Sequence, residues 1–279
     1  MKVLVTGASG NIGRAVSARL AAEKAEVHAL VLTEPAPDTA THTVVGDAGD
    51  PETVRAAIAG GVDAVVHLAA IPSPDLGTPV EVFAGNTRAT FNVLEECARA
   101  GVRRAVIASS YSILGLRFAP RVLHPAYYPI DEATPFQIED AYSLSKQADE
   151  ATAAMMHRRY GMDVVALRFP YTAGWDAIRR TAESCERDPA TMAADSWSYL
   201  HVDDAAEAVW LALTKELQGF HAVLLAAPTT MAAASTVELI RRYHGETELR
   251  EDIPGNRAPI DTTAIERLLG FRATRTLGG

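Results

Sequence analysis

A short apolar strand that runs straight into a glycine loop constrains this chain more than any other feature. Residues 3–6 read Val-Leu-Val-Thr, and Gly7, Gly10 and Gly13 follow at G-x-x-G-x-x-G spacing. Residues 11–22 then show helical periodicity. A strand, a glycine turn and a helix in this order let the backbone approach a pyrophosphate, beside free N–H groups and the positive end of the helix dipole. The segment therefore predicts a dinucleotide-binding loop rather than a plain turn.

Strand-like and helix-like segments alternate through the first two thirds of the chain. The strand-like segments are near-continuous apolar runs, which is typical of strands buried on both faces of a parallel sheet. We therefore predict an α/β fold, a Rossmann-type doubly wound parallel sheet with a small C-terminal substrate-binding lobe. Further strands are expected over residues 27–32, 43–45, 63–68, 105–109, 164–169 and 222–227, and further helices over residues 51–59, 79–100, 141–160, 203–214, 236–243 and 260–269.

The expected division of the chain is uneven. Residues 1–170 carry the regular alternation and are predicted to form the dinucleotide-binding Rossmann core. Residues 171–279 are predicted to form mainly the substrate lobe. The two are interleaved, because residues 203–227 are expected to return to the core. No internal repeat or low-complexity tract marks a boundary between them.

Composition excludes several classes of protein. The 279 residues carry a net charge of −9 and are 48% hydrophobic, which argues against disorder and against a surface built to bind nucleic acid. No apolar run approaches the roughly 20 residues of a membrane span, and the amino terminus lacks a signal-peptide pattern. Two cysteines, Cys97 and Cys185, are too few for a disulfide framework, although a single bridge stays open. We expect a cytoplasmic protein that binds neither nucleic acid nor membrane.

Tyr142 and Lys146 form a Y-x-x-x-K pair at the start of the helix expected over residues 141–160. Four residues apart, the two side chains share one helix face. A tyrosine hydroxyl is a poor base at neutral pH, but a nearby lysine ammonium favours the phenolate form. The tyrosine could then exchange a proton with a substrate hydroxyl while hydride leaves or reaches the same carbon. The pair therefore predicts a redox active site.

The end of the second predicted strand should distinguish NAD from NADP. An acid there binds the ribose hydroxyls, whereas an arginine favours a 2′-phosphate. Residues 27–34 place neither group at the strand end. Glu34 comes late but could reach the ribose, and Arg14 could reach a 2′-phosphate or stay solvated. We expect NAD or NADP, with NAD favoured. Asp47, after the third strand, is expected to bind the adenine amino group or to cap its own turn.

These motifs resemble those of the short-chain dehydrogenase/reductase superfamily, in its extended branch of NAD-dependent epimerases and dehydratases. The resemblance covers nearly all of the chain. In the family's N-x-x-G-T-x-N-V-L-E motif, Ala89 replaces the glycine. The matching segments are residues 6–13 (T-G-x-x-G-x-x-G), 61–70 (D-x-V-x-H-L-A-A), 86–95 (N-x-x-G-T-x-N-V-L-E), 109–115 (S-S-x-x-V-Y-G), 167–170 (L-R), 198–204 (H-V-D-D) and 260–271 (the closing helix).

The resemblance implies roles for individual residues. Ser110 would be catalytic together with Tyr142 and Lys146, holding the substrate oxygen beside the tyrosine. No metal site is expected, because the histidines are scattered. The residues expected to bind the cofactor are Gly7, Ser9, Gly10, Asn11, Ile12, Gly13, Thr33, Asp47, Ala48, Leu68, Ala69, Ala70, Asn86, Ser109, Tyr142, Lys146 and Pro170. The residues expected to contact substrate are Ser73, Ser110, Tyr111, Tyr171 and Arg179.

Two departures from the family pattern narrow the expected chemistry. Tyr111 and Ser112 stand where the 4,6-dehydratases of this branch carry Asp-Glu, so such a dehydratase is not expected. Residues 174–197 are short where nucleotide-sugar epimerases carry a longer insert for the diphosphate. The chain is thus nearest in type to uronate-dehydrogenase-like members, which act on free sugars or other small hydroxy compounds. Arg179 and Arg180 could bind a carboxylate or phosphate there, or form a solvated helix face.

One function and two alternatives follow. The expected function is NAD(P)-dependent hydride transfer between nicotinamide and a hydroxyl or keto carbon of a sugar-like small molecule. The first alternative is a sugar or nucleotide-sugar epimerase that holds NAD tightly and re-reduces its own intermediate. The second is a non-catalytic protein that senses the nicotinamide cofactor, since a fold alone does not establish function. The resemblance also implies a homodimer formed through the helices over residues 79–100 and 141–160.

Overall fold

A seven-stranded parallel sheet forms the centre of the molecule, with strand order β10-β7-β5-β4-β1-β2-β3. The computed structural model describes residues 1–245 and 247–278. Because β1 pairs with β2 on one side and with β4 on the other, the strand order reverses there, and the predicted doubly wound sheet is confirmed. The strands are β1 (Lys2–Thr6), β2 (Glu26–Val31), β3 (His42–Val45), β4 (Ala64–His67), β5 (Arg104–Ser110), β7 (Asp163–Phe169) and β10 (Phe220–Leu224).

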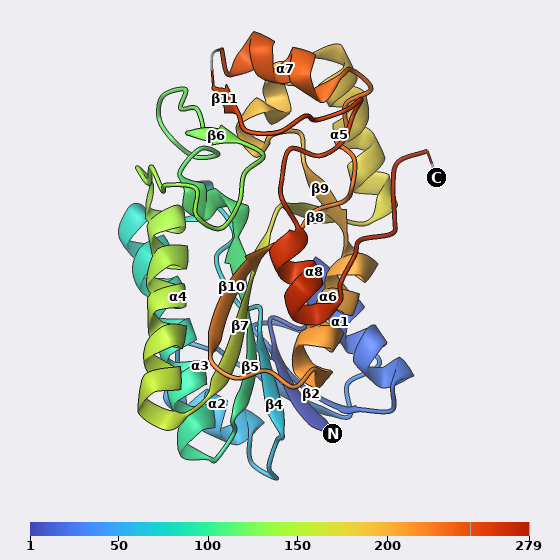
Figure 1. Cartoon of the computed structure of the whole chain (residues 1–279). Coiled ribbons are helices and arrows are strands. Elements are labelled where there is room, and N and C mark those ends of the chain that lie inside the picture. Colours follow the sequence, from blue (N-terminus) through green and yellow to red (C-terminus); the bar gives the residue numbers. More distant parts are fainter. Residues whose placement is uncertain (246, 279) are drawn as a thin grey trace.

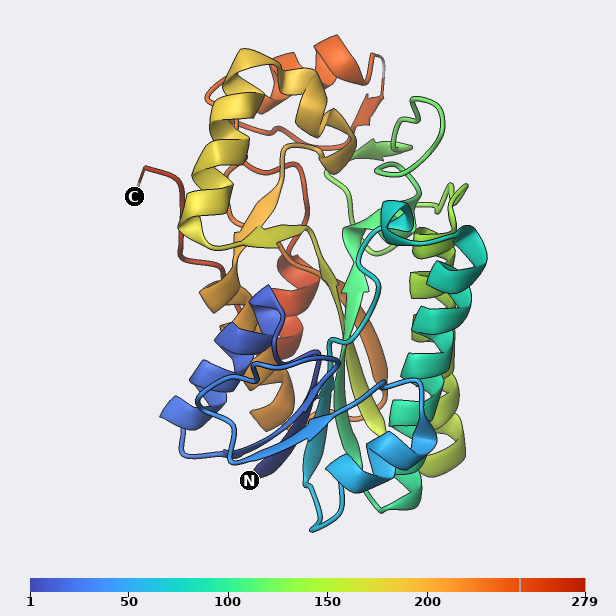
Figure 2. The same cartoon turned by 180° about the vertical axis from the view of Figure 1, so that it is seen from behind.

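Helices cover both faces of this sheet (Figures 1 and 2). Successive strand side chains point to opposite faces. On β1, Val3 and Val5 accordingly join the core under α1 and α6, whereas Leu4 joins the core under α3 and α4. This two-sided burial explains the continuous apolar runs. One face carries α1 (Asn11–Ala22), α6 (Val202–Thr214) and α8 (Thr263–Leu269), and the other carries α2 (Pro51–Ala57), α3 (Pro79–Arg99) and α4 (Ala141–Tyr160).

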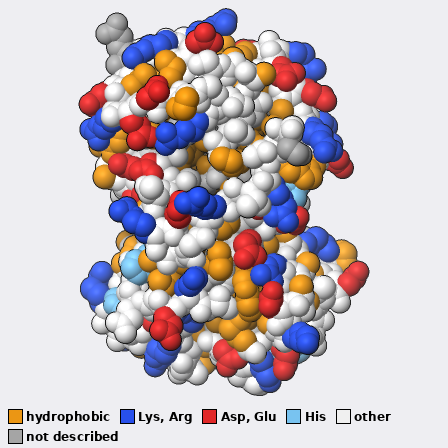
Figure 3. All heavy atoms as spheres, turned by 45° about the vertical axis from the view of Figure 1, so that its right-hand side comes forward, with side chains coloured by type: hydrophobic (Ala, Val, Ile, Leu, Met, Phe, Trp, Pro, Cys, Tyr) orange, Lys and Arg blue, Asp and Glu red, His pale blue; other side chains and the backbone are white. Residues whose placement is uncertain are grey.

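A smaller lobe lies beyond the carboxyl ends of the strands, at the top of Figure 1. The surface narrows between this lobe and the sheet below it (Figure 3). Its core contains the fully buried Tyr128, Trp197 and Tyr199, so the lobe is assembled from segments far apart in the sequence. Its elements are α5 (Trp175–Arg187), α7 (Thr236–Tyr243), a 3₁₀ helix over Pro189–Asp195, and the strand pairs β8 (Tyr171–Ala173) with β9 (Tyr199–His201) and β6 (Tyr127–Tyr128) with β11 (Glu248–Leu249).

Several element boundaries differ from the sequence-based prediction by one or two residues, and two differ by three, each of these because a backbone group finds another partner. The strand expected over residues 222–227 leaves the sheet after Leu224, since the N–H of Ala227 donates to the carbonyl of Tyr199 at 2.8 Å. The last helix begins at Thr263 rather than at Ile260, because Ile260 forms a β-bridge with Ile130. Hydrophobic periodicity does not report such long-range pairings.

Within the described ranges, none of the helices is long and apolar enough to cross a membrane. Cys97 and Cys185 are both buried and free, so the single bridge left open by the sequence does not form. Burial raises the pKa of the Cys97 thiol to about 12, which makes it an inert core residue.

Candidate functional site

A cleft of about 910 Å³ opens at the carboxyl ends of β1, β2, β3 and β4. This is the point where the strand order reverses, and ligands of open α/β sheets bind there. The glycine loop, the segment after β4 and α3 form most of its wall. The predicted cofactor residues in the lining are Gly7, Ser9, Gly10, Asn11, Ile12, Gly13, Asp47, Ala48, Leu68, Ala69, Ala70 and Asn86.

The glycine loop is shaped by contacts that leave no room for side chains. Gly7 has φ +66°, and a Cβ there would lie 2.8 Å from the backbone nitrogen of Ala69. A Cβ at Gly13 would lie 2.2 Å from the carbonyl oxygen of Gly7. The α1 helix has no side-chain cap and no acidic residue in its first turn, so its amino terminus keeps N–H groups for an anion. The loop therefore fits a dinucleotide pyrophosphate.

Asp47 lines the cleft and also caps its own turn. Its Oδ1 accepts the N–H of Gly49 at 2.7 Å, and its Oδ2 pairs with Arg88 of α3 at 3.0 Å. The turn-capping role is thus observed, and the expected contact with adenine stays a prediction. Arg88 was not anticipated as a lining residue, because no sequence motif marks a single arginine on a long helix.

The end of β2 presents an apolar side chain to the cleft. Leu32 is 70% exposed and lines it. Glu34 instead turns its carboxylate to its own loop, where Oε2 accepts the N–H two residues later at 2.8 Å. Arg14 donates to the carbonyls of Ser9 and Pro35 at 2.9 and 3.0 Å. The guanidinium is therefore fixed beside the glycine loop, near the place where a ribose would lie.

The three predicted catalytic residues come together at the carboxyl end of β5. Ser110 ends that strand, while Tyr142 and Lys146 lie on the first turns of α4. All three are buried, and the Lys146 Nζ lies 5.6 Å from the centroid of the Tyr142 ring. None of them is in the cleft lining, but Lys146 donates to the carbonyl of Ala108 at 3.1 Å, and Ala108 does line the cleft. The pair thus lies directly behind the cleft floor.

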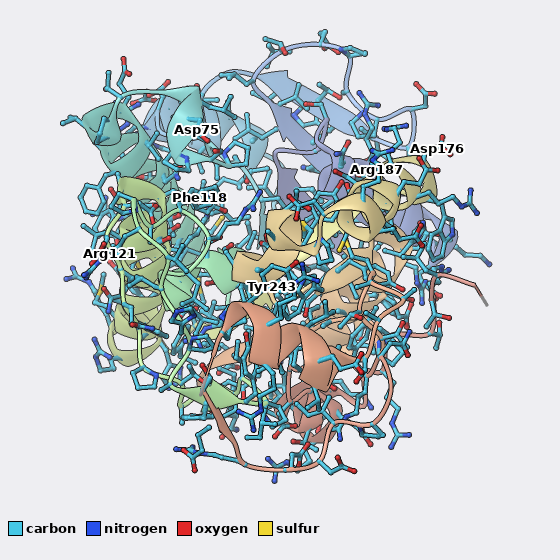
Figure 4. The ribbon with its side chains drawn as sticks, turned by 90° about the horizontal axis from the view of Figure 1, so that it is seen from above. Asp75, Phe118, Arg121, Asp176, Arg187 and Tyr243 are labelled. Atoms are coloured by element: carbon cyan, nitrogen blue, oxygen red, sulfur yellow. The ribbon has the colours of Figure 1, made fainter. Side chains whose placement is uncertain are left out.

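Ser110 and Tyr142 keep groups available for a substrate oxygen. Ser110 Oγ accepts the N–H of Ser112 at 3.1 Å, which leaves its proton free to be donated. Phe118 packs edge-on against the Tyr142 ring, with centroids 5.6 Å apart. Seen from above, Phe118 lies beside α4, across the molecule from Asp176 and Arg187 of α5 (Figure 4). The tyrosine ring is therefore held by an aromatic neighbour rather than by a hydrogen bond.

Ser109 was predicted to bind the cofactor, and the structure places its hydroxyl in an ion-pair network. Ser109 donates to Glu150 at 2.6 Å, and Arg168 donates to both oxygens of Glu150 at 2.9 and 2.8 Å. All three side chains are buried. The network joins β5, α4 and β7. Sequence alone could not indicate it, because the partners are 18 and 41 residues apart.

The side chain of Asn86, also predicted to bind the cofactor, forms hydrogen bonds within the protein. Its Oδ1 accepts the N–H of Ile71 at 2.7 Å, and its Nδ2 donates to the Ile71 carbonyl and to Ser145 Oγ, each at 3.1 Å. These three bonds fix the loop after β4 against α3 and α4. Ile71 and Pro72 consequently line the cleft, which the sequence did not predict.

His67 at the end of β4 is a neutral hydrogen-bonding residue. Its Nδ1 lies 2.8 Å from Thr6 Oγ1 and its Nε2 lies 3.1 Å from Thr90 Oγ1. Burial lowers its pKa to about 3, and repulsion from Lys146 acts in the same direction. In the part of the chain that the structure describes, no group of three His, Cys, Asp or Glu side chains could hold a metal ion.

A second hollow, of about 340 Å³, lies in the lobe between β8, α5 and the 3₁₀ helix over Pro189–Asp195. Tyr171 of β8 lines the hollow, and the next residue, Thr172, lines the cofactor cleft. Arg180 is the charged member of the hollow's lining. Arg179 does not line it and holds its guanidinium 5.7 Å from the Trp175 ring. The lining residues are Tyr171, Ala177, Arg180, Thr181, Ser184, Thr191 and Met192.

Four other predicted site residues line neither cavity. Tyr111 is buried in the lobe core, where its hydroxyl lies 2.8 Å from Ser196 Oγ, and burial raises its pKa well above the ordinary value. Ser73 caps a short 3₁₀ helix over Pro74–Leu76. Thr33 and Pro170 are likewise absent from the two linings. Their contacts with a ligand stay predictions.

The chain belongs to the NAD dependent epimerase/dehydratase family, whose model matches residues 3–225. This confirms the family predicted from the glycine loop, the β4 motif and the Tyr–Lys pair. The match ends at Leu225, just after β10, so the lobe elements α7 and β11 lie outside it.

Two curated relatives are dehydrogenases of sugars or sugar acids. The chain is 28% identical over 170 residues to uronate dehydrogenase from Pseudomonas syringae pv. tomato, which covers 60% of this chain and 58% of that protein. It is 29% identical over 191 residues to L-arabinose 1-dehydrogenase (NAD(P)(+)) from Haloferax volcanii, covering 66% and 72%. The match thus spans less than two thirds of the uronate dehydrogenase.

Solved structures share the fold over almost the whole chain. A crystal structure of a UDP-galactose 4-epimerase superposes with a TM-score of 0.71 at 26% identity, covering 99% of this chain and 94% of that one. Dehydrogenases and epimerases therefore both stand among the relatives.

Proposed function

We propose that this chain is an NAD(P)-dependent oxidoreductase of the extended short-chain dehydrogenase/reductase type. It transfers a hydride between the nicotinamide and a hydroxyl or keto carbon of a sugar-like small molecule. The observation that carries the proposal is the position of the Tyr142–Lys146 pair directly behind Ala108, on the floor of a cleft with a glycine cradle. A plain surface pair on a helix would not lie there.

The cleft offers a partner for each part of the cofactor. The N–H groups at the start of α1 suit the pyrophosphate, and the turn at Asp47 and Ala48 suits the adenine. The apolar wall at Leu68, Ala69 and Ala70 suits the nicotinamide side. Bound there, the cofactor would accept a hydride in oxidation or donate one in reduction. NAD is the expected form, and Arg14 is the residue that would accommodate a 2′-phosphate.

Side chains of this protein carry out the proton transfer that accompanies hydride transfer. Tyr142 takes the proton of the substrate hydroxyl in oxidation, or gives one to the carbonyl oxygen in reduction. Ser110 donates a hydrogen bond to the same oxygen, since its own lone pair already accepts from Ser112. Lys146 remains an ammonium, which favours the phenolate form of the tyrosine and can bind the cofactor ribose.

The small hollow beside Tyr171 supports a free sugar or sugar acid as substrate. Its hydroxyl groups can bind sugar hydroxyls, and Arg180 can bind a carboxylate. We assign the binding of a carboxylate to Arg180 rather than to Arg179, because Arg179 lines neither cavity. The names of the two curated relatives, a uronate dehydrogenase and an L-arabinose 1-dehydrogenase, support the same class of substrate.

The proposal includes a homodimer in the cytoplasm. Phe91 on α3 is 43% exposed and Leu144 on α4 is 44% exposed. Exposed apolar side chains on two long neighbouring helices are suited to pairing with a second copy.

Substitution of Tyr142 tests the function. We expect Tyr142→Phe to retain cofactor binding, measured by titration of nicotinamide fluorescence, and to lose turnover by about 10²- to 10⁴-fold. Tyr160→Phe is the matched control, because Tyr160 lies at the far end of α4 and bonds to Glu95 at 2.7 Å; it should keep turnover. Full activity in Tyr142→Phe contradicts the proposal.

The epimerase alternative is favoured by the similarity to the UDP-galactose 4-epimerase. An epimerase regenerates its cofactor, so no reduced cofactor accumulates. Absorbance of bulk NADH with a panel of sugars and uronates separates the two reactions. Tight cofactor binding without turnover on the whole panel points to the non-catalytic sensing protein instead.

A further inference from the structure

Asp149 lies on α4 one turn after Lys146, and both side chains are buried. Asp149 is 1% exposed and Lys146 is 4% exposed. Lys146 donates to Asp149 Oδ2 at 3.3 Å and to the carbonyl oxygen of Ala108 at 3.1 Å. The ammonium is therefore held between a backbone carbonyl at the cleft floor and a carboxylate in the protein interior.

One oxygen of the Asp149 carboxylate, Oδ2, accepts the hydrogen bond from Lys146. Within residues 1–245 and 247–278, the second oxygen of this carboxylate, Oδ1, makes no hydrogen bond. The adjacent Glu150 differs, because Arg168 and Ser109 satisfy it. Replacing both members of a buried ion pair by apolar side chains is often neutral or stabilising, above all where one carboxylate oxygen is left without a partner. The presence of the buried Lys146–Asp149 pair therefore calls for a reason other than stability.

The other titratable groups around Lys146 do not replace this carboxylate. On α4 the neighbours are Tyr142 and Glu150, and Glu150 is already engaged in its own ion pair. On β4 the neighbour is His67, whose low pKa of about 3, caused mainly by burial, leaves the ring uncharged. From β5 the contact is a backbone carbonyl. Balancing the Lys146 charge thus falls to Asp149.

We propose that Asp149 is a positioning residue that keeps Lys146 charged and oriented at the cleft floor, available to Tyr142 and to the cofactor ribose. This deepens the proposed function and rests on it for its catalytic consequence. Burial by itself lowers the pKa of Lys146, but the attraction of Asp149 and then of Tyr142 outweighs it and leaves that pKa raised. Without the carboxylate, burial prevails, and a neutral amine no longer favours the phenolate.

The titration of Lys146 can be followed directly, because the chain holds only four lysines, Lys2, Lys24, Lys146 and Lys215. In protein labelled at the lysine side chains, NMR over a pH series reads each ammonium, and a Lys146→Arg variant assigns the buried one. We expect wild-type Lys146 to lose its proton at higher pH than the other three. In Asp149→Asn, its titration should move down by about one to three pH units.

Two further variants keep this test decisive. Glu216→Gln removes an exposed carboxylate from the loop before β10 and should leave the Lys146 titration unchanged. Asp149→Ser is smaller and neutral, and it should give the same downward shift if Asp149→Asn fails to fold. An unchanged titration in a folded Asp149 variant overturns the proposal. So does a wild-type Lys146 that loses its proton at lower pH than the exposed lysines.

The pH–rate profile separates positioning from a merely structural role. If Asp149 acts through Lys146, the alkaline limb of kcat in Asp149→Asn moves down with the lysine titration and the KM for the cofactor rises, whatever the accompanying change in the unfolding midpoint. A lower unfolding midpoint with an unmoved alkaline limb overturns the proposal. If wild-type protein turns over no substrate, the proposed function fails, and the NMR titration still tests Asp149.

Discussion

The cofactor cleft and the lobe hollow are lined by different kinds of groups. The cleft wall is largely backbone, glycine and apolar side chains, and its shape is fixed by contacts such as that of Gly13 with the Gly7 carbonyl. The hollow is lined by side chains from one face of α5, with Arg180 and several hydroxyls. A backbone cradle binds what all dinucleotides share, whereas a side-chain hollow changes with each substitution. Under the proposed function, we therefore expect the lobe to determine the choice of substrate.

Among the changes that test this contrast, the largest effect is expected from a change in the backbone cradle. In Gly13→Ala, the new Cβ would lie 2.2 Å from the Gly7 carbonyl oxygen, so the loop must move away from its binding geometry. We expect cofactor affinity to fall by about 10- to 100-fold, measured by calorimetric titration. Gly174→Ala in the lobe is the matched control, because a Cβ at this N-cap position meets nothing within 4 Å. Equal losses in the two variants contradict the contrast between the regions.

A smaller effect is expected in the hollow, and it should depend on substrate charge. Arg180→Gln should lower kcat/KM for a uronate by about 10-fold and leave that for a neutral pentose nearly unchanged, because a charge-assisted hydrogen bond is lost. Arg179→Gln is the control, since its guanidinium stands over Trp175 outside the hollow. A loss that is the same for charged and neutral sugars shows that Arg180 does not select the substrate.

The smallest effect concerns stability, where the two regions respond to pH in opposite directions. His67 in the core has its pKa lowered from 6.5 to about 3, chiefly by burial. The stability that its neutral ring gives to the folded state is therefore lost as the pH falls from about 6.5 towards 3. Asp195 beside the lobe has its pKa raised from 3.8 to about 6, again chiefly by burial and against the attraction of Arg117. The stability that protonated Asp195 gives to the folded state is present at low pH and is lost as the pH rises through about 6.

The variant Asp195→Asn tests the part of this pH dependence of stability that comes from Asp195. Between pH 4 and 6, the free energy of unfolding of the variant should rise with pH more steeply than that of wild type, by up to about 1.4 kcal/mol per pH unit. Denaturant unfolding at several pH values measures the slopes. Glu186→Gln, which removes an exposed carboxylate of α5, should keep the wild-type slope. Parallel slopes for Asp195→Asn and wild type contradict the expected protonation of Asp195.

The same contrast explains what the sequence could predict. The core follows from local signals: apolar runs that are buried on both faces, glycines that the backbone requires, and a Tyr–Lys pair one turn apart on α4. These signals predicted the sheet, the part of the cleft lining that comes from the glycine loop and the end of β4, and the residues behind the cleft floor. The helix bounds Asn11–Ala22 and Ala141–Tyr160 agree with the periodicity to the residue.

The lobe depends on pairings that leave no local signal. The β6–β11 pair joins two-residue strands that lie far apart in the sequence, at residues 127–128 and 248–249, and no periodicity exists in two residues. The choice between Arg179 and Arg180 depends on the rotation of α5, which a single-residue difference changes by about 100°. The hydroxyl of Ser109 and the carboxylate of Asp149 gain their meaning from buried partners, which spacing along the chain does not reveal.

The triple bonding of Asn86 has a mechanical consequence. One amide grips both backbone groups of Ile71 on the cleft wall and reaches Ser145, the residue that precedes Lys146. The cleft wall and the helix that carries Tyr142 and Lys146 are thus joined through one side chain. Under the proposed function, a ligand that displaces this wall would also strain α4, so filling the cleft and aligning the tyrosine would be coupled.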